Sequence, residues 1–182
     1  MDPMISVVIP VYSGGSFLGP AIESVLKQTY QDFEIILVDN NASETTRNVG
    51  LNFVNKFPHK IKMIKENHQG VCSARNTGIL SAKGKYIALL DDDDMMFPAR
   101  LEKQLKVSVE NPRIAMVLCG QSNFDKFSGT INEKNIFGAH GQWKKRELLV
   151  KKAFSIVLNN RNLNSFKFAF PSTMFFEKEK AL

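Results

Sequence analysis

Cysteine is scarce in this sequence, which has only Cys72 and Cys119 among its 182 residues. This number and spacing exclude a disulfide framework and a metal site with several cysteine ligands. We interpret both residues as small buried hydrophobic side chains. A reducing, cytoplasmic compartment fits this composition.

Long apolar runs are absent as well. No run approaches the roughly 18–20 residues that a membrane-spanning helix requires. The N-terminus lacks the basic and apolar segments of a signal peptide. The hydrophobic fraction of 43% and the charged fraction of 23% are ordinary for a globular protein. The length therefore allows one domain with a substantial core.

The sequence also lacks the glycine-rich motifs that bind phosphate. Residues 12–16 do not match G-x-G-x-x-G. Residues 78–85 resemble a P-loop only superficially, because five residues separate the two glycines and Tyr86 replaces the serine or threonine. A strand pattern rather than a helix pattern follows. Any bound phosphate would therefore have to be held by a metal ion.

Acidic residues are few near the C-terminus. Residues 1–139 contain 15 basic and 15 acidic side chains, whereas residues 140–182 contain nine and three, which accounts for the net charge of +6. A basic segment can bind an anionic substrate, nucleic acid or the inner face of a membrane, but it is more often a solvated surface. No nucleic-acid-binding motif accompanies it, so we expect no such partner.

Apolar runs alternate with helical patterns over the first hundred residues. Strands are predicted at residues 5–9, 33–38, 61–64 and 86–90, with Pro10 ending the first. Helices are predicted from about residue 17 to 26, from the cap Ser43 to 57, and from 72 to 82, the last stopped by Gly84. This alternation predicts an α/β fold with a mostly parallel central sheet flanked by helices.

The pattern is less regular after residue 111. A fifth strand is predicted at residues 114–119 and a hairpin tip at residues 128–129. Residues 144–158 have one apolar and one basic helical face, which could dock on the domain itself or on a membrane. Residues 168–176 are expected to return to the sheet.

Polar segments follow three of the predicted strands, at residues 11–13, 39–40 and 91–94. Ligands of parallel sheets bind outside the carboxyl ends of the strands, so these segments are candidates for a site. Tyr12 offers a flat face for a base, and Asp39 can accept a hydrogen bond from a ring N–H such as the imide of uracil. The alternatives are a core aromatic residue and a turn residue.

Four successive carboxylates, residues 91–94, follow the fourth strand. If the extended geometry continues, Asp91 and Asp93 point to the same side. They could then hold a ribose and a hard cation such as Mg²⁺ or Mn²⁺. A solvated acidic turn is the alternative. Arg75 could meet the nucleotide, pair with the aspartates or form a surface salt bridge.

Several segments occur together in one colinear series over about residues 4–105. They are residues 5–12, 21–30, 33–39, 74–79, 82–87 and 90–94, with Gly70, Pro98, Leu101 and Glu102. In this combination the sequence resembles family 2 glycosyltransferases of the GT-A fold. The family usually has a second acidic residue where this chain has Asn40.

The resemblance implies a metal-dependent, inverting transfer of a sugar from a nucleotide-diphospho-sugar to an acceptor hydroxyl. We expect a UDP-sugar donor, Mn²⁺ or Mg²⁺ as cofactor, and a polysaccharide, lipid-linked or protein acceptor. The resemblance implies that Asp39 contacts the nucleotide base, Asp91 contacts the ribose and Asp93 binds the metal. Asp92 would fill the variable middle position of this motif. The other nucleotide-binding residues that we expect are Pro10, Val11, Tyr12 and Arg75.

The resemblance also implies a division within one domain. Residues 1–110 would form the nucleotide-sugar-binding half, and residues 111–182 the start of an acceptor-side part. The family's catalytic base lies in a later acidic motif, so we expect it beyond Leu182 and expect slow transfer, or none, by this chain alone. Glu177 and Glu179 have lysine neighbours typical of a solvated helix start. A non-catalytic nucleotide-sugar-binding module is the main alternative; a nucleotidyltransferase is disfavoured by the missing glycine-rich loop.

Overall fold

The computed structural model describes residues 2–119, 123–124, 131–132 and 171–181. Its strands are β1 (Ile5–Val11), β2 (Phe33–Asp39), β3 (Ile61–Lys65), β4 (Tyr86–Leu89), β5 (Met116–Leu118), β6 (Asn123–Phe124), β7 (Ile131–Asn132) and β8 (Met174–Glu177). Its helices are α1 (Leu18–Leu26), α2 (Glu44–Lys56), α3 (Val71–Ser81) and α4 (Arg100–Glu110). The 3₁₀ turns within these described residues are η1 (Gly15–Phe17), η3 (Pro171–Thr173) and η4 (Lys178–Lys180).

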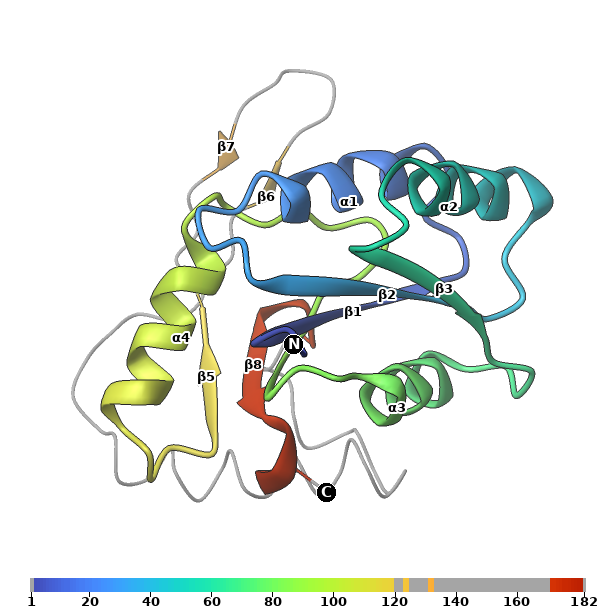
Figure 1. Cartoon of the computed structure of the whole chain (residues 1–182). Helices are drawn as coiled ribbons and strands as arrows, with labels where there is room; N and C mark the ends of the chain where they lie inside the picture. The colour runs from blue at the N-terminus through green and yellow to red at the C-terminus, as the bar shows by residue number, and fades with distance from the viewer. Residues whose placement is uncertain (1, 120–122, 125–130, 133–170, 182) are drawn as a thin grey trace.

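A six-stranded sheet in the order β3-β2-β1-β4-β8-β5 forms the centre of the molecule (Figure 1). The first four strands are parallel, and β8 lies antiparallel between β4 and β5. The short strands β6 and β7 pair antiparallel in a second sheet. The predicted α/β fold with a mostly parallel sheet is therefore confirmed.

Helices cover both faces of this sheet (Figure 1), with α1 and α2 on one face and α3 on the other. Alternate residues of a strand point to opposite faces. Val7 and Ile9 accordingly belong to the apolar cluster that includes Leu18 and Ile22 of α1, whereas Val8 packs with Ala74 of α3. All six side chains are fully buried, which explains the unbroken apolar run of β1.

Pro10 does not end the first strand, contrary to the prediction. The carbonyls of Met4 and Val8 accept hydrogen bonds from the N–H groups of Tyr86 and Leu90. The backbone polar groups of the even-numbered residues of β1 therefore point toward β4. Pro10 also faces that side, but β4 has already ended at Leu89. Its missing N–H therefore lies beyond the paired part of β1 and β4, and the strand continues to Val11 beside β2.

Gly84 has a different role from the predicted helix stop. Helix α3 ends at Ser81, and Gly84 lies where the chain crosses β1 closely. A Cβ atom on Gly84 would lie 2.5 Å from the backbone nitrogen of Ser6. Ser43, in contrast, caps α2 as predicted, because its hydroxyl accepts a hydrogen bond from the N–H of Thr46.

The later part of the chain is described only in pieces. The fifth strand is shorter than predicted, and residues 174–176 return to the sheet as expected. The predicted hairpin tip at residues 128–129 and the helix at 144–158 lie outside the described residues. Within the described part of the chain, no helix has the length and apolar character to cross a membrane.

Candidate functional site

The carboxyl ends of β1, β2 and β4 meet at one edge of the sheet. Val11 pairs with Asp39 in the register, and the N–H of Asn40 donates to the Val11 carbonyl at 3.0 Å. The fold therefore brings the polar segments that follow these strands together. Tyr12 is 51% exposed at this edge, whereas the side chains of Pro10 and Val11 are buried, so these two residues can offer only their backbone to a ligand.

The acidic run forms a turn, because the N–H of Asp94 donates to the carbonyl of Asp91 at 3.2 Å. The strand has already ended at Leu89. The expected extended geometry is therefore wrong, and strand alternation does not decide which carboxylates point together. Each of the four side chains has its own surroundings.

Asp92 joins the acidic turn to the loop that follows β1. Its Oδ2 accepts hydrogen bonds from the backbone N–H groups of Tyr12 at 2.9 Å and Gly14 at 2.7 Å. A Cβ atom on Gly14 would lie 2.7 Å from both Cγ and the carbonyl oxygen of Asp92. Only glycine permits this close approach, so Asp92 fixes where Tyr12 lies relative to the other aspartates.

Asp91 is held from two directions. Arg75 of α3 forms an ion pair with its Oδ1, and the N–H of Asp91 donates to the hydroxyl of Ser172 at 2.9 Å. The Asp91 side chain is 28% exposed, so its other oxygen remains available to a ligand. Arg75 is buried, and its Nε has no hydrogen-bond partner among the described residues. Three alternatives were considered for Arg75, and the structure shows one of them, the ion pair with an aspartate.

Asp93 is exposed near the tip of the turn. Desolvation and the charges of Asp94 and Asp92 raise the pKa of its carboxyl group above the ordinary value. A cation would offset this repulsion, and carboxylate oxygens suit Mg²⁺ or Mn²⁺. Among the described residues, no three acidic, histidine or cysteine side chains are arranged to hold a metal. Phosphate and water oxygens would have to complete the coordination, as these ions commonly require.

Asp39 is nearly buried, with 5% of the residue exposed. Its Oδ1 accepts a hydrogen bond from the N–H of Ala42 at 2.9 Å, and its Oδ2 accepts one from Arg47 Nε at 2.6 Å. Burial alone would raise the pKa of Asp39, but these two hydrogen bonds and the Arg47 charge outweigh burial and hold the pKa below its ordinary value. The carboxylate is therefore ionised, and each oxygen keeps one lone pair for a further donor.

Asn40 is buried and fastens the loop between β3 and α3. Its Nδ2 donates to the carbonyls of Glu66 at 3.0 Å and His68 at 2.9 Å, and its Oδ1 accepts from the N–H of Gly70 at 2.7 Å. A carboxylate could not make the two donated bonds. This departure from the family pattern therefore has a structural reason in this chain.

Arg100 and Gln104 lie beneath the acidic turn and were not predicted. Arg100 Nη2 donates to the carbonyls of Leu89 at 3.1 Å and Met174 at 3.4 Å, and its Nε donates to Gln104 Oε1. Gln104 Nε2 donates to the carbonyl of Thr173 at 2.9 Å. Their spacing puts both on one face of α4, but the sequence gives no sign that this face is buried.

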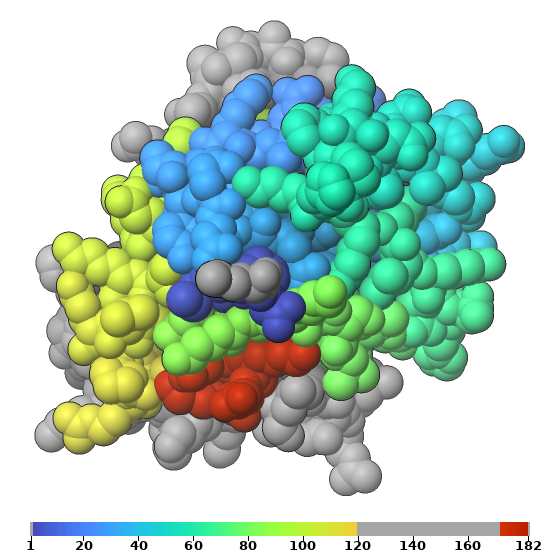
Figure 2. All heavy atoms as spheres, in the orientation of Figure 1, coloured from blue at the N-terminus to red at the C-terminus, as the bar shows by residue number. Residues whose placement is uncertain are grey.

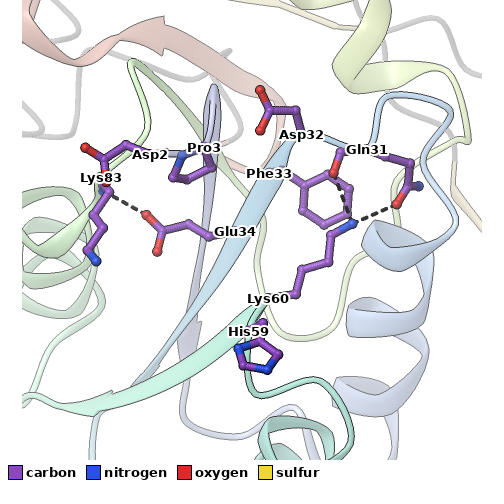
Figure 3. A pocket seen from close by; sticks show the side chains of 9 residues that line it. All are labelled: Asp2, Pro3, Gln31, Asp32, Phe33, Glu34, His59, Lys60 and Lys83. Carbon is purple, nitrogen blue, oxygen red and sulfur yellow. Dashed lines mark hydrogen bonds between the residues drawn. The ribbon is translucent and has the colours of Figure 1, made fainter.

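A cavity of about 380 Å³ lies at the opposite edge of the sheet, among segments that precede the strands (Figure 3). Lys60 donates to the carbonyl and Oε1 of Gln31, and Glu34 accepts from the N–H of Lys83 (Figure 3). In Figure 2 the dark blue N-terminal residues mark the centre of this face. This cavity lies away from the polar segments that follow the strands, so it is not the candidate site.

Comparisons with known proteins agree with this fold. The family described as "Glycosyl transferase family 2" matches residues 6–178. Glycosyltransferase GlyG of Streptococcus pneumoniae serotype 4 is 31% identical over 180 residues, which are 98% of this chain and 58% of that protein. The match covers 58% of the length of GlyG and 40% of the length of another relative, the uncharacterized glycosyltransferase RP339 of Rickettsia prowazekii.

Solved structures share the fold. The mannosyltransferase PcManGT from Pyrobaculum calidifontis, in complex with GDP-Man and Mn²⁺, has a TM-score of 0.59 and 22% identity over 65% of this chain and 36% of its own. Residues 1–349 of S. aureus TarS in complex with UDP-GlcNAc have a TM-score of 0.58 and 22% identity over 71% of this chain and 37% of their own.

Proposed function

Since this chain belongs to glycosyl transferase family 2, we propose that it binds a nucleotide-diphospho-sugar at the carboxyl edge of its sheet for inverting transfer to an acceptor hydroxyl. The observation that carries this proposal is the convergence of Tyr12, Asp39 and the acidic turn of residues 91–94. An aromatic face, a nearly buried carboxylate and a turn with one exposed and three partly buried carboxylates are groups that can bind a base, a ribose and a metal-bound diphosphate.

The donor is proposed to be a UDP-sugar. Tyr12 would stack on the uracil, Asp39 would accept a hydrogen bond from its imide N–H, and Asp91 would accept from a ribose hydroxyl. The backbone of Pro10 and Val11 would border the base, and Arg75 would lie beside the nucleotide. Because one structural neighbour holds GDP-Man and another UDP-GlcNAc, the fold alone does not choose the base.

The metal is proposed to be Mn²⁺ or Mg²⁺, with Asp93 as its protein ligand. When bound, such an ion stabilises negative charge on the diphosphate leaving group. The acceptor oxygen would form a bond to the anomeric carbon of the sugar while the bond to the diphosphate oxygen breaks. Asp92 contributes by holding the turn against the loop that bears Tyr12.

The acceptor hydroxyl must also lose a proton to a base. Glu177 does not suit this role, because it pairs with Tyr86 at the amino end of β4, away from the acidic turn. It also forms ion pairs with Lys180 at 2.5 Å and Lys85 at 3.5 Å, and these lysines hold its pKa below the ordinary value despite partial desolvation. We therefore expect the catalytic base outside this terminal turn. The acceptor is proposed to be a polysaccharide, a lipid-linked sugar or a protein, with peripheral membrane contact through the basic residues after 140.

Titration calorimetry of UDP with Mn²⁺ and with EDTA tests the proposal. We expect the affinity for UDP to depend on Mn²⁺, and Asp93→Asn to weaken that dependence without unfolding the protein. Asp32→Asn is the matched control, because Asp32 is an exposed carboxylate at the opposite edge. Equal binding of UDP in Mn²⁺ and in EDTA would contradict the metal site. Binding of UDP-sugars without turnover of any acceptor would favour a non-catalytic binding module, whereas release of pyrophosphate from a nucleoside triphosphate would indicate a nucleotidyltransferase.

A further inference from the structure

Arg47 occupies an unusual position for a cation. It is the fourth residue of α2, close to the helix N-terminus, where the helix dipole disfavours positive charge. A residue that contradicts a local preference in this way needs a compensating partner. Here the partner is Asp39, whose Oδ2 accepts the 2.6 Å hydrogen bond from Arg47 Nε.

A second contact fixes the direction of the Arg47 side chain. Its Nη2 donates to the carbonyl of Ala42 at 2.9 Å, while the N–H of Ala42 donates to Oδ1 of Asp39. The three residues thus close a ring of hydrogen bonds around the carboxylate. Asp39 cannot rotate without breaking one of them, so its remaining acceptor positions have a fixed direction.

Among the described residues near Asp39, Arg47 is the cation that both pairs with the carboxylate and donates a hydrogen bond to it. The charged or titratable residues around Asp39 are Arg47 and Glu44 on α2, Lys65 on β3, and, on the next loop, Glu66, whose N–H donates to the Asp39 carbonyl, and His68, whose carbonyl accepts from Asn40. Lys65 contributes only its charge, whereas Arg47 contributes both charge and a hydrogen bond. The Arg47 side chain is 38% exposed and the Asp39 side chain 7%.

We infer that Arg47 is a positioning residue that determines which nucleotide base the site prefers. It does so by holding Asp39 as an oriented acceptor for a ring N–H. The inference rests on the nucleotide site proposed above. An ionised carboxylate accepts from the imide N–H of uracil but repels the N3 lone pair of cytosine. Without Arg47, the carboxyl group can turn and bind a proton, and a protonated carboxyl group can donate to that lone pair.

The ratio of UDP to CDP affinity is the measurement that isolates this role, because the two rings have the same size and differ at this edge. We expect Arg47→Gln to lower the preference for UDP by roughly tenfold or more, the usual effect of a lost charge-assisted hydrogen bond. Arg47→Lys keeps the charge but lacks the planar fork, so an intermediate preference is expected. Lys65→Gln removes a nearby charge without a hydrogen bond and should keep the preference of the unmodified chain.

Calorimetry with Mn²⁺ on these four proteins separates the outcomes. If the affinities of Arg47→Gln for UDP and CDP fall together and their ratio is unchanged, Arg47 only stabilises the loop and the inference is overturned. If Arg47→Gln does not fold, the ratio measured for Arg47→Lys decides in the same way. Failure of the unmodified chain to bind UDP would instead overturn the proposed function, and this inference with it.

Discussion

Single residues at the carboxyl edge do more than provide ligands. Asp92 was expected to fill a variable position, yet its carboxylate accepts two backbone hydrogen bonds from the loop after β1. Asn40, where the resemblance leads us to expect a second acidic residue, holds the loop before α3 in place. Both side chains arrange their neighbours, so replacing them should change the site without removing a proposed ligand group.

Gly14→Ala tests the contact with Asp92. The added Cβ would lie 2.7 Å from Asp92 atoms that include its backbone oxygen, so the acidic turn must move. We expect the affinity for UDP with Mn²⁺ to fall by roughly tenfold, the equivalent of one or two hydrogen bonds. Gly19→Ala in α1 is the control, because the nearest atom to its Cβ would be 3.9 Å away. Unchanged affinity in Gly14→Ala would show that the turn adapts freely.

Asn40→Asp tests the fastening of the loop. The carbonyls of Glu66 and His68 would lose their donors and face a negative charge instead. We expect the free energy of unfolding, measured in urea, to fall by about 1–3 kcal/mol. Asn41→Asp should have little effect, because Asn41 is exposed and has a φ of 67°, which aspartate also tolerates. Equal unfolding midpoints for the two variants would contradict this account.

The sequence predicted that the polar segments after the strands meet at one edge of the sheet, but not how their side chains are arranged there. Tyr12 and Asp39 were found because each follows an apolar strand pattern, and neighbouring parallel strands must end together. Arg47 was missed because its partner precedes it by eight positions in the sequence, across a loop whose shape no local pattern determines. Ser172 reaches Asp91 across 81 positions, a contact that only the tertiary fold creates.

Helix α3 packs very closely against the sheet. Gly78 faces β1 and β2, and a Cβ there would lie 2.3 Å from Cγ1 of Val8 and 3.1 Å from Cγ2 of Val38. This approach brings α3, which bears Arg75, close enough for the ion pair with Asp91. Close packing of this helix therefore contributes directly to the arrangement of the site.

Gly78→Ala should destabilise the protein, although alanine usually favours a helix. Overpacking of this kind costs about 1–3 kcal/mol, measured as a lower free energy of unfolding in urea. Val8→Ala in the same chain removes the clashing methyl groups, so the double variant should lose less stability than the two single variants together. Strictly additive losses would show that Val8 is not what limits the approach.

Strand patterns and strand order differ in how well the sequence predicts them. The β-branched runs of β1 and β2 were recognised because both strands are buried on both faces. The end of β1 was misplaced, because whether a proline ends a strand depends on what lies beside it. The place of β8 between β4 and β5 has no local signal, since its partners are contributed by distant segments.

At the scale of the whole molecule, Glu34 links three strands at the amino edge. Its Oε1 accepts from the hydroxyl of Ser6 and the N–H of Lys83, both at 2.7 Å, and its Oε2 pairs with Lys62 at 3.0 Å. Desolvation would raise the pKa of Glu34, but these hydrogen bonds and the Lys62 charge together lower it. Its ionised form is thus favoured by the folded state.

Acid should therefore weaken the fold through Glu34. A pKa lowered in the folded state gives stability that is present above the ordinary value of 4.5 and lost as the pH falls through the folded value. We expect the melting temperature to fall as the pH is lowered below about 4.5. In Glu34→Gln the melting temperature should fall less over the same range. Glu23→Gln, which alters an exposed ion pair on α1, should leave the acid profile as it is. A profile of Glu34→Gln identical to that of the unmodified chain would refute this.

The position of β8 has a consequence for how the chain folds during synthesis. Residues 174–177 lie between two strands that leave the ribosome much earlier, β4 and β5. Until they emerge, β4 has an open hydrogen-bonding edge and β5 lacks the partner that it has among the described strands. An open, apolar strand edge is a template for pairing with another chain. Nascent chains stalled before residue 174 should therefore be more prone to aggregation and proteolysis than those stalled shortly after β8, and chaperones that shield strand edges should act within this interval.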